Sequence, residues 1–343
     1  MILPNRRFLF RSAGVCVVGL LVVTVCASVV GAIYQYLGNR RDLRAHPAPG
    51  KLFDIGSRHL HLWCVGSGSP VVVLEAGGGG NALEWSRVQP EVAKTTRVCS
   101  YDRAGFGWSD LGPAPRTAGQ IANELHRLLQ VAQVPAPYVL AGHSIGGLYI
   151  RQYASTNPKD VAGMVLVDAT HEDVRTRIPG AAPNVLLLHV VTDLHSALAV
   201  VGWARLMDIR FAGGPALGAQ ANVLAEGIKF RTTAPYADGE ESLGWEESAS
   251  QVRQTRRVLD IPLVVVTRGR WDGLRGLPED KQLQMKRAWG EMQADLVTLS
   301  PQGTQVVAVN SDHYVHLGQP DVVIDAIRTV VAKARVALHS SGS

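Results

Sequence analysis

The sequence has few cysteines, and their spacing excludes two common kinds of site. Four are present in 343 residues and no two of them form C-x-x-C, so zinc ribbons and thioredoxin-like sites are excluded. Cys16 and Cys26 fall within an apolar run, where cysteine serves as a small hydrophobic residue. Cys64 and Cys99 are the two that remain in the rest of the chain.

Signals for nucleic-acid, phosphate and metal binding are missing as well. The net charge is +5, but much of the excess flanks an apolar run near the N-terminus, and no basic stripe with interleaved aromatic residues occurs elsewhere. We therefore expect no nucleic-acid partner. The glycine-rich stretch 76–80 lacks the Lys-Ser/Thr pair that a phosphate-binding loop needs. His59 and His61 alternate on one strand, but no Asp-His continuation follows, so we expect no metal site.

The long apolar run predicts a membrane segment. Residues 13–37 carry no charge over 25 positions, enough to span a hydrocarbon core with some tilt. A basic flank at 1–12 precedes the run, and a linker at 38–51 follows it. We expect an uncleaved single-pass anchor. The positive charges of the two flanks nearly cancel, so they do not set its orientation. By analogy with signal anchors, we expect the large domain to be extracytoplasmic. The alternative is a signal peptide cleaved near 25–27, which leads to a secreted protein.

Apolar strands alternate with helical patterns in the rest of the chain. Stretches such as VVVLEA, RVCSYD, YVLAGH, VAGMVLVD and IPLVVVTRG are typical of buried strands, while TAGQIANELHRLLQVA has helical spacing. Further helices are expected at about 83–94 and 279–299. This alternation predicts an α/β fold with a doubly wound, mostly parallel sheet, interrupted by a largely helical, apolar segment at 171–260.

One stretch, YVLAGHSIGG at residues 138–147, predicts a reactive serine. It contains G-x-S-x-G around Ser144, with an apolar strand before it and a helical pattern after it, which is the context of a nucleophile elbow. Gly142 and Gly146 are needed because a side chain at either would collide across so tight a turn. In an acyl-transfer enzyme, the glycines at 76–80 let a backbone N–H face the developing oxyanion. We expect the N–H groups of Gly78 and Ile145 to form this oxyanion hole.

The chain resembles the α/β-hydrolase fold superfamily. The resemblance rests on VVVLEAGGGG with Trp85 downstream, YDRAGFGWSD, GHSIGG, IPLVVVTRG and SDHYVHLGQPDVV, and it covers about 52 to 335 apart from the middle segment. It implies a core of 52–170 and 261–338, a helical cap at 171–260 and a tail at 339–343. The family often has His-Gly where this chain has Ala76-Gly77. In this fold the strands of Cys64 and Cys99 are neighbours, which allows two buried thiols or one disulfide.

The resemblance also implies a catalytic triad. His313 follows the last strand and completes the order serine, acid, histidine, so it is the expected base for Ser144. His316 is the second choice and is expected in the pocket or on the surface. Either of two aspartates can supply the acid: Asp272, which we prefer because G-x-x-D is the commoner arrangement, and Asp168.

These residues predict a serine hydrolase that cleaves an ester-like bond without a cofactor. The substrate is expected to be a small molecule, and hydrophobic if the apolar cap walls its pocket; the cap residues could equally pack onto the sheet's helices. A serine at the elbow argues against epoxide hydrolase and haloalkane dehalogenase chemistry, which uses aspartate there. Alternatives are acyl transfer, hydrolysis of amide, thioester or C–C bonds, peracid formation, or a non-catalytic membrane-tethered binding protein.

Overall fold

The computed structural model describes residues 6–178, 180 and 182–341. The flank expected at 1–12 and the tail expected at 339–343 therefore lie partly outside the described residues. Within this part of the chain, eight strands form one sheet in the order β1-β2-β4-β3-β5-β6-β7-β8. The strands are β1 (Lys51–Asp54), β2 (His59–Val65), β3 (Val71–Glu75), β4 (Val98–Tyr101), β5 (Tyr138–His143), β6 (Val161–Val167), β7 (Leu263–Arg268) and β8 (Gly303–Ala308).

The sheet is mostly parallel, as expected. β1 and β2 pair antiparallel, as do β2 and β4, and every other pair is parallel. β3 is buried along its whole length, and its side chains alternate between two cores. Val71 and Val73 pack into one core with residues of α3 and α4, while Val72 and Leu74 pack into the other with residues of α13. Helices therefore cover both faces of the sheet, which is why its strands are continuous apolar runs.

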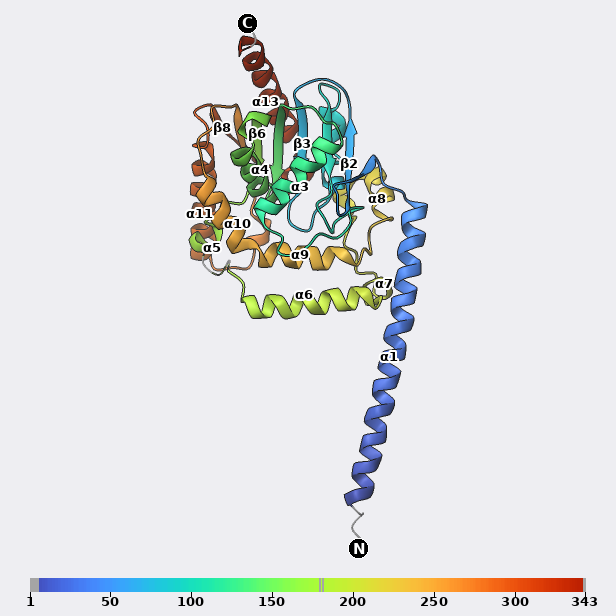
Figure 1. Cartoon of the computed structure of the whole chain (residues 1–343). Helices are drawn as coiled ribbons and strands as arrows, with labels where there is room; N and C mark the ends of the chain where they lie inside the picture. The colour runs from blue at the N-terminus through green and yellow to red at the C-terminus, as the bar shows by residue number, and fades with distance from the viewer. Residues whose placement is uncertain (1–5, 179, 181, 342–343) are drawn as a thin grey trace.

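The helices surround the sheet and extend from it at both ends (Figure 1). They are α1 (Arg6–Ala45), α2 (Gln89–Val92), α3 (Ala118–Val131), α4 (Ile145–Thr156), α5 (Val174–Arg177), α6 (Val185–Val200), α7 (Trp203–Leu206), α8 (Ala219–Ala225), α9 (Thr233–Leu243), α10 (Trp245–Thr255), α11 (Glu279–Val297), α12 (Val315–Gly318) and α13 (Pro320–Ser341). Short 3-10 turns add η1 (Ala82–Trp85), η2 (Pro158–Asp160), η3 (Pro215–Leu217) and η4 (Asp272–Leu274).

Two local expectations differ from the structure. The helix expected at 83–94 is replaced by the short turns η1 and α2, because Pro90 near the start of α2 lacks the N–H that a continuous helix would use. The linker expected at 38–51 is mostly helical, since α1 continues to Ala45 and only residues 46–50 separate it from β1.

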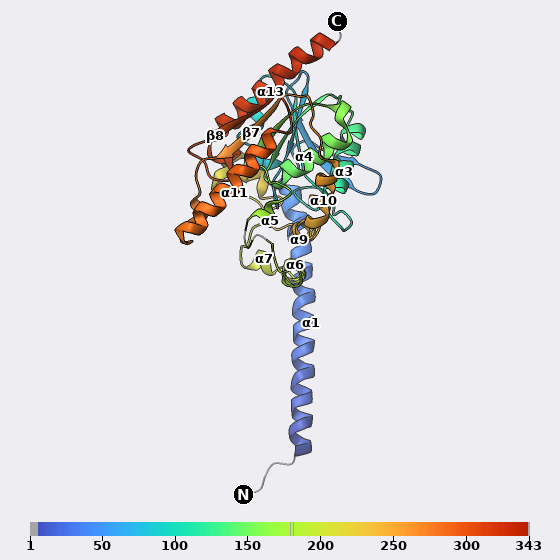
Figure 2. The same cartoon turned by 90° about the vertical axis from the view of Figure 1, so that its left-hand side faces the viewer.

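The N-terminal helix α1 projects away from the domain, and the C-terminal end of α13 lies at the opposite end of the molecule (Figures 1 and 2). Within the described residues, Val17–Ala45 is the one helical stretch long and apolar enough to cross a membrane. Its most apolar window has a mean hydropathy of 2.4 and is not buried. Such a helix is an anchor or a signal sequence.

A disulfide joins Cys64 in β2 to Cys99 in β4. The two residues face each other in the antiparallel register of these strands, which brings their Cα atoms to 4.0 Å. Of the two outcomes that the sequence left open, the structure thus has the disulfide.

Candidate active site

The predicted elbow forms at the end of β5. The strand ends at His143, Ser144 has a positive φ of 52° with ψ of −124°, and α4 begins at Ile145. The two flanking glycines have the steric role expected of them. A Cβ on Gly142 would lie 2.7 Å from the carbonyl carbon of Gly146, and a Cβ on Gly146 would lie 2.4 Å from the carbonyl oxygen of Ala76. The strained backbone therefore holds the Ser144 hydroxyl at the tip of the turn.

A hydrogen-bonded chain links Ser144 to a histidine and a buried carboxylate. His313 Nε2 lies 3.0 Å from Ser144 Oγ, and His313 Nδ1 lies 2.6 Å from Asp168 Oδ2. The three side chains come from the ends of β5 and β6 and from the loop after β8, so the parallel strands bring them to one edge of the sheet. Thr170 joins them, because its Oγ1 lies 3.4 Å from Ser144 Oγ.

Asp168 is held firmly in its position. It is fully buried and adopts a positive φ of 42°, which is rare for a residue other than glycine. Its Oδ1 accepts hydrogen bonds from Trp289 Nε1 at 2.9 Å and from the Arg268 backbone N–H at 3.2 Å. The Arg268 guanidinium also forms an ion pair with Oδ2, with a separation of 2.8 Å. These partners hold the carboxylate in place against His313.

The structure corrects the preference for Asp272 as the partner of His313. Asp272 lies in η4 beyond β7 and forms ion pairs with Arg270 at 2.6 Å and Arg275 at 2.7 Å, and 36% of its side chain is exposed. The side of His313 that faces α11 is occupied by Trp289, whose ring lies 6.3 Å from the histidine ring. The loop after β7 thus carries its aspartate outward to two arginines, while the loop after β6 supplies the carboxylate.

The glycine-rich loop after β3 lies against the elbow. A Cβ on Gly77 would meet His143 Nδ1 at 2.6 Å, so this position requires glycine, whereas Gly78 would meet only the Ile145 side chain at 3.7 Å. The two expected oxyanion donors therefore belong to adjacent segments. Among the described residues, neither the Gly78 nor the Ile145 N–H has a hydrogen-bond partner in the protein.

Arg103 holds this loop in place through the loop's carbonyl oxygens, a role that was not expected from the sequence. Its guanidinium is buried and donates hydrogen bonds of 2.8 Å to the carbonyl oxygens of both Ala76 and Gly77. The same group binds Glu75 at 2.8 Å and, with two contacts of 2.7 and 2.9 Å, Glu241 of α9. Arg103 thus connects the end of β3, the glycine loop and the cap. Its position in YDRAGFGWSD was the only available signal.

Two further histidines lie behind the site. His316 is fully buried and packs against Trp85 and His143, so the expectation of a pocket or surface residue is wrong. Burial lowers the pKa of His316 to about 3, and burial also holds the pKa of His143 well below its usual value. Both imidazoles are therefore neutral near pH 7. Glu84, whose pKa burial raises to about 7, accepts a hydrogen bond from the Gly77 N–H at 3.3 Å.

The described residues contain one cluster with the donor atoms of a metal site. Glu84, His143 and His316 each offer one atom, and the three atoms lie within 4.8 Å of one another. The alternating histidines of β2 instead have separate partners, since His59 binds Asp110 and His61 binds Asp102. The expectation that the enzyme works without a metal stays a prediction.

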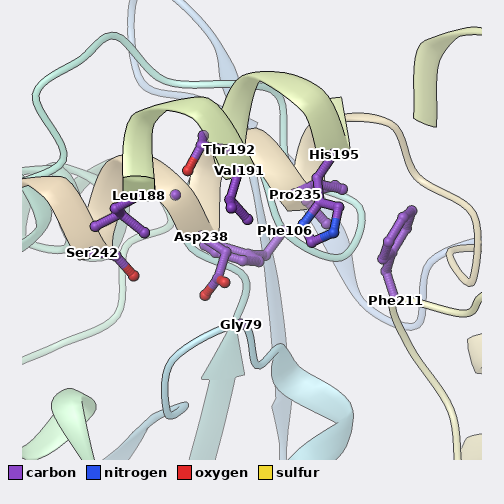
Figure 3. Close-up of a pocket in the computed structure, with 12 residues that line it drawn as sticks. Gly79, Phe106, Leu188, Val191, Thr192, His195, Phe211, Pro235, Asp238 and Ser242 are labelled. Atoms are coloured by element: carbon purple, nitrogen blue, oxygen red, sulfur yellow. The ribbon is translucent and has the colours of Figure 1, made fainter. Parts of the chain in front are cut away.

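A cavity of about 430 Å³ lies between the cap and the glycine loop. Figure 3 shows α6 and α9 as its two long walls, with Gly79 of the glycine loop facing Asp238 from below. Polar groups line it together with apolar ones: Leu188, Val191, Thr192, His195, Phe211, Pro235, Asp238 and Ser242. The cap helices therefore do both things that the sequence left open, since α10 packs on α3 and α4 while α6 walls a cavity.

Comparisons with known proteins agree on the fold. The sequence matches the Alpha/beta hydrolase family over residues 71–326. It is 28% identical over 306 residues to a probable transporter, efuK, of Hormonema carpetanum, covering 82% of this chain and 42% of that protein. An AB hydrolase superfamily protein of Gibberella zeae is 25% identical over 295 residues, covering 78% of this chain and 87% of that one.

Solved structures show the same likeness. A thermophilic esterase of Thermogutta terrifontis superposes with a TM-score of 0.55 at 21% identity, covering 81% of this chain and 94% of the esterase. Other structures with this fold include a putative lipase and epoxide hydrolases. The chain spans only about half the length, 42% and 53%, of two relatives, efuK and an uncharacterised Schizosaccharomyces pombe protein.

Proposed function

The chain belongs to the alpha/beta hydrolase family, and from this membership and the geometry above we propose that it is a serine hydrolase of carboxylic esters. The observation that carries the proposal is the chain of hydrogen bonds from Ser144 through His313 to Asp168. An unassisted serine hydroxyl is a poor nucleophile, and a neighbouring imidazole held by a buried carboxylate is the arrangement that activates it.

The distances support the following mechanism. Ser144 Oγ attacks the ester carbonyl carbon while its proton passes to His313 Nε2, 3.0 Å away. Asp168 holds the imidazole in the tautomer with a proton on Nδ1 and stabilises the cation that forms. The N–H groups of Gly78 and Ile145 donate hydrogen bonds to the oxyanion. His313 then returns the proton to the leaving alcohol, and water releases the acyl group from Ser144.

We also propose that α1 is a single-pass anchor and that the catalytic domain lies outside the cytoplasm. The disulfide between β2 and β4 supports this location, since disulfides form and persist in oxidising compartments. The alternative, a cleaved signal sequence and a secreted enzyme, predicts the same disulfide but a mature chain without the apolar helix.

The experiment combines active-site labelling with turnover. The full chain in detergent is treated with a fluorophosphonate probe, and hydrolysis of 4-nitrophenyl esters of increasing chain length is measured beside Ser144→Ala. We expect labelling and turnover by the parent protein and loss of both in Ser144→Ala, with the rate falling by about 10³-fold or more. Labelling without hydrolysis, but with transfer to an added alcohol, indicates acyl transfer. A folded parent protein that neither labels nor turns over contradicts the proposal and favours a binding protein.

A further inference from the structure

The outer face of α6 is apolar, which is the reverse of what a helix on a water-soluble protein presents. Thr192 is buried and faces α9, and His195 lines the cavity. The residues on the opposite side are leucines and valines that stand in the open, with exposed fractions of 74% for Leu186, 61% for Leu187, 55% for Val190 and 55% for Leu194. A surface helix normally turns its polar side to water. We call this set the outer face of α6.

α6 and α7 contact α1 at a defined position along its length. Gly31 of α1 packs so closely on the turn between them that a Cβ there would lie 2.2 Å from the carbonyl oxygen of Val201. Beyond this contact, Arg205 of α7 binds Asp42 at 2.6 Å and Gln35 at 3.0 Å. Gly31 lies within the apolar run 13–37, about 9 Å before its end at roughly 1.5 Å per residue.

The position of the Gly31 contact places α6 at the edge of the bilayer that α1 spans. A run of 25 residues is about 38 Å long, whereas the hydrocarbon core measures about 30 Å, so the excess is about 4 Å at each end. The Gly31 contact therefore lies roughly 5 Å inside the hydrocarbon boundary. Interfacial helices lie at a similar depth, with their apolar face about 5–10 Å into the headgroup and acyl boundary.

The orientation of α6 fits the same position. Figure 1 shows α6 running across the underside of the domain, crosswise to α1, and Figure 2 shows α6 end-on. A helix that runs crosswise to a membrane-spanning helix lies close to the plane of the membrane surface when the spanning helix is only slightly tilted. α6 packs on α9 through Thr192, which lies against Gly239. Because α9 lies between α6 and the sheet (Figure 1), the opposite side of α6 is turned away from the sheet, which is the side on which the N-terminal part of α1 extends.

We propose that the outer face of α6 lies in the surface of the membrane that α1 spans, and that the enzyme takes an acyl-ester lipid from this leaflet. The cavity behind α6 connects the two parts of the proposal, because its wall includes Leu188 and Val191 on one side and Gly79 of the glycine loop on the other. A lipid that leaves the bilayer along α6 would therefore enter a cavity that ends at the glycine loop, where Gly79 adjoins the expected oxyanion donor Gly78.

The substrate half of the inference rests on the proposed function. The ester C–O bond of the lipid breaks, the acyl group passes to Ser144 Oγ, and the proton of Ser144 goes through His313 to the leaving alcohol. Water then releases the fatty acid. The membrane half rests on the geometry of α1 and α6 alone, so the two halves are tested by different measurements.

Depth is measured on the full chain in phosphatidylcholine vesicles. Anionic lipid is not needed, because α6 contains no lysine or arginine. In a Cys16→Ala, Cys26→Ala background, a bimane label is placed at Leu194→Cys or, as the control, at Val336→Cys on α13 at the far end of the molecule. Val336 is 71% exposed.

We expect spin-labelled lipid to quench the label at position 194 at least threefold more than the control label at position 336, and aqueous iodide to quench the label at 194 less than the control. Equal quenching at both positions overturns the membrane half.

Activity is measured in the same vesicles with two substrates, a lipid with a fluorogenic acyl ester and a short-chain 4-nitrophenyl ester. Leu187→Asp/Leu194→Asp alters the outer face of α6 but no residue of the cavity wall. We expect it to lower lipid hydrolysis tenfold or more while short-ester turnover stays within twofold, and Val336→Asp to change neither rate. A parent protein that hydrolyses only the short ester overturns the lipid substrate. A parent protein that hydrolyses neither substrate contradicts the proposed function. The quenching experiment then still tests whether α6 lies in the membrane surface.

Discussion

At the scale of single residues, the two candidate aspartates provide the sharpest test. Asp168 is buried against His313, whereas Asp272 pairs with two arginines at the surface. We expect Asp168→Asn to lower kcat for a short ester by about 10³- to 10⁴-fold, because the amide favours the wrong imidazole tautomer. Asp272→Asn should stay within threefold of the parent. Equal rates for the two variants would remove Asp168 from the mechanism.

Glu84 makes the stability of the protein depend on pH. Burial raises its pKa from 4.5 to about 7, so between these values the folded protein holds a proton that the unfolded chain releases. The folded state therefore loses stability as pH rises through this window. Glu84→Gln removes the loss and can still accept the Gly77 hydrogen bond.

We expect the Tm of Glu84→Gln relative to the parent to rise between about pH 5 and about pH 8. The change corresponds to on the order of 2 kcal/mol, since one pKa unit is about 1.4 kcal/mol. Glu291→Gln, on an exposed part of α11, is the control for loss of a carboxylate. A pH-independent difference in Tm would show that Glu84 does not titrate in this way.

At the scale of elements, Arg103 joins the cap to the glycine loop. Arg103→Lys keeps the charge but loses the planar fork that binds two carbonyl oxygens and Glu241 at once. We expect kcat to fall by about 10- to 100-fold, because complete removal of an oxyanion donor lowers kcat by about 10²- to 10³-fold and this variant only displaces one.

The matched control for Arg103→Lys is Arg116→Lys. Arg116 is equally buried and binds Glu124 with two contacts of 2.8 Å. Unlike Arg103, it does not bind the carbonyl oxygens of Ala76 and Gly77. Both variants should lose stability, measured as Tm, and only Arg103→Lys should lose activity at a temperature well below either Tm. Parallel losses of activity would reduce Arg103 to a residue of the fold.

The disulfide tests which compartment holds the domain. With Cys16 and Cys26 replaced by alanine, Cys64 and Cys99 are the two cysteines left. Protein denatured directly from cells should take up no maleimide-polyethylene glycol before reduction and two groups after it. A cytoplasmic domain would be labelled twice without reduction, because that compartment keeps thiols reduced.

At the scale of the whole molecule, the contact between α1 and the cap decides how the domain is held at the membrane. Gly31→Val forces a side chain against the Val201 backbone, whereas Gly19→Val adds the same side chain where nothing lies within 4 Å. We expect Gly31→Val in vesicles to lower lipid hydrolysis about fivefold or more and to speed proteolysis of the cap, while Gly19→Val does neither. Equal behaviour of the two variants would show that the contact is dispensable.

The sequence alone determined the features that depend on local pattern. Continuous apolar strands alternating with helical spacing predict a parallel sheet covered on both faces, and the structure confirms it. The tight turn around Ser144 is equally local, since its glycines and flanking strand and helix are neighbours in the chain. The position of His313 after the last strand follows from counting strands.

The tertiary structure decided what depends on contacts between distant segments. Asp168 and Asp272 both follow apolar strands. Only the packing of Arg268 and Trp289, which lie 100 and 121 residues from Asp168, holds one of the two aspartates against His313. In the sequence, nothing distinguishes Arg103 from the other charged residues. Its role depends on Glu75 and Glu241, which the fold brings into contact with it. The apolar composition of α6 was plain in the sequence, but which side faces outward was not, because a helix that is apolar over most of its surface has no periodicity from which to read its orientation.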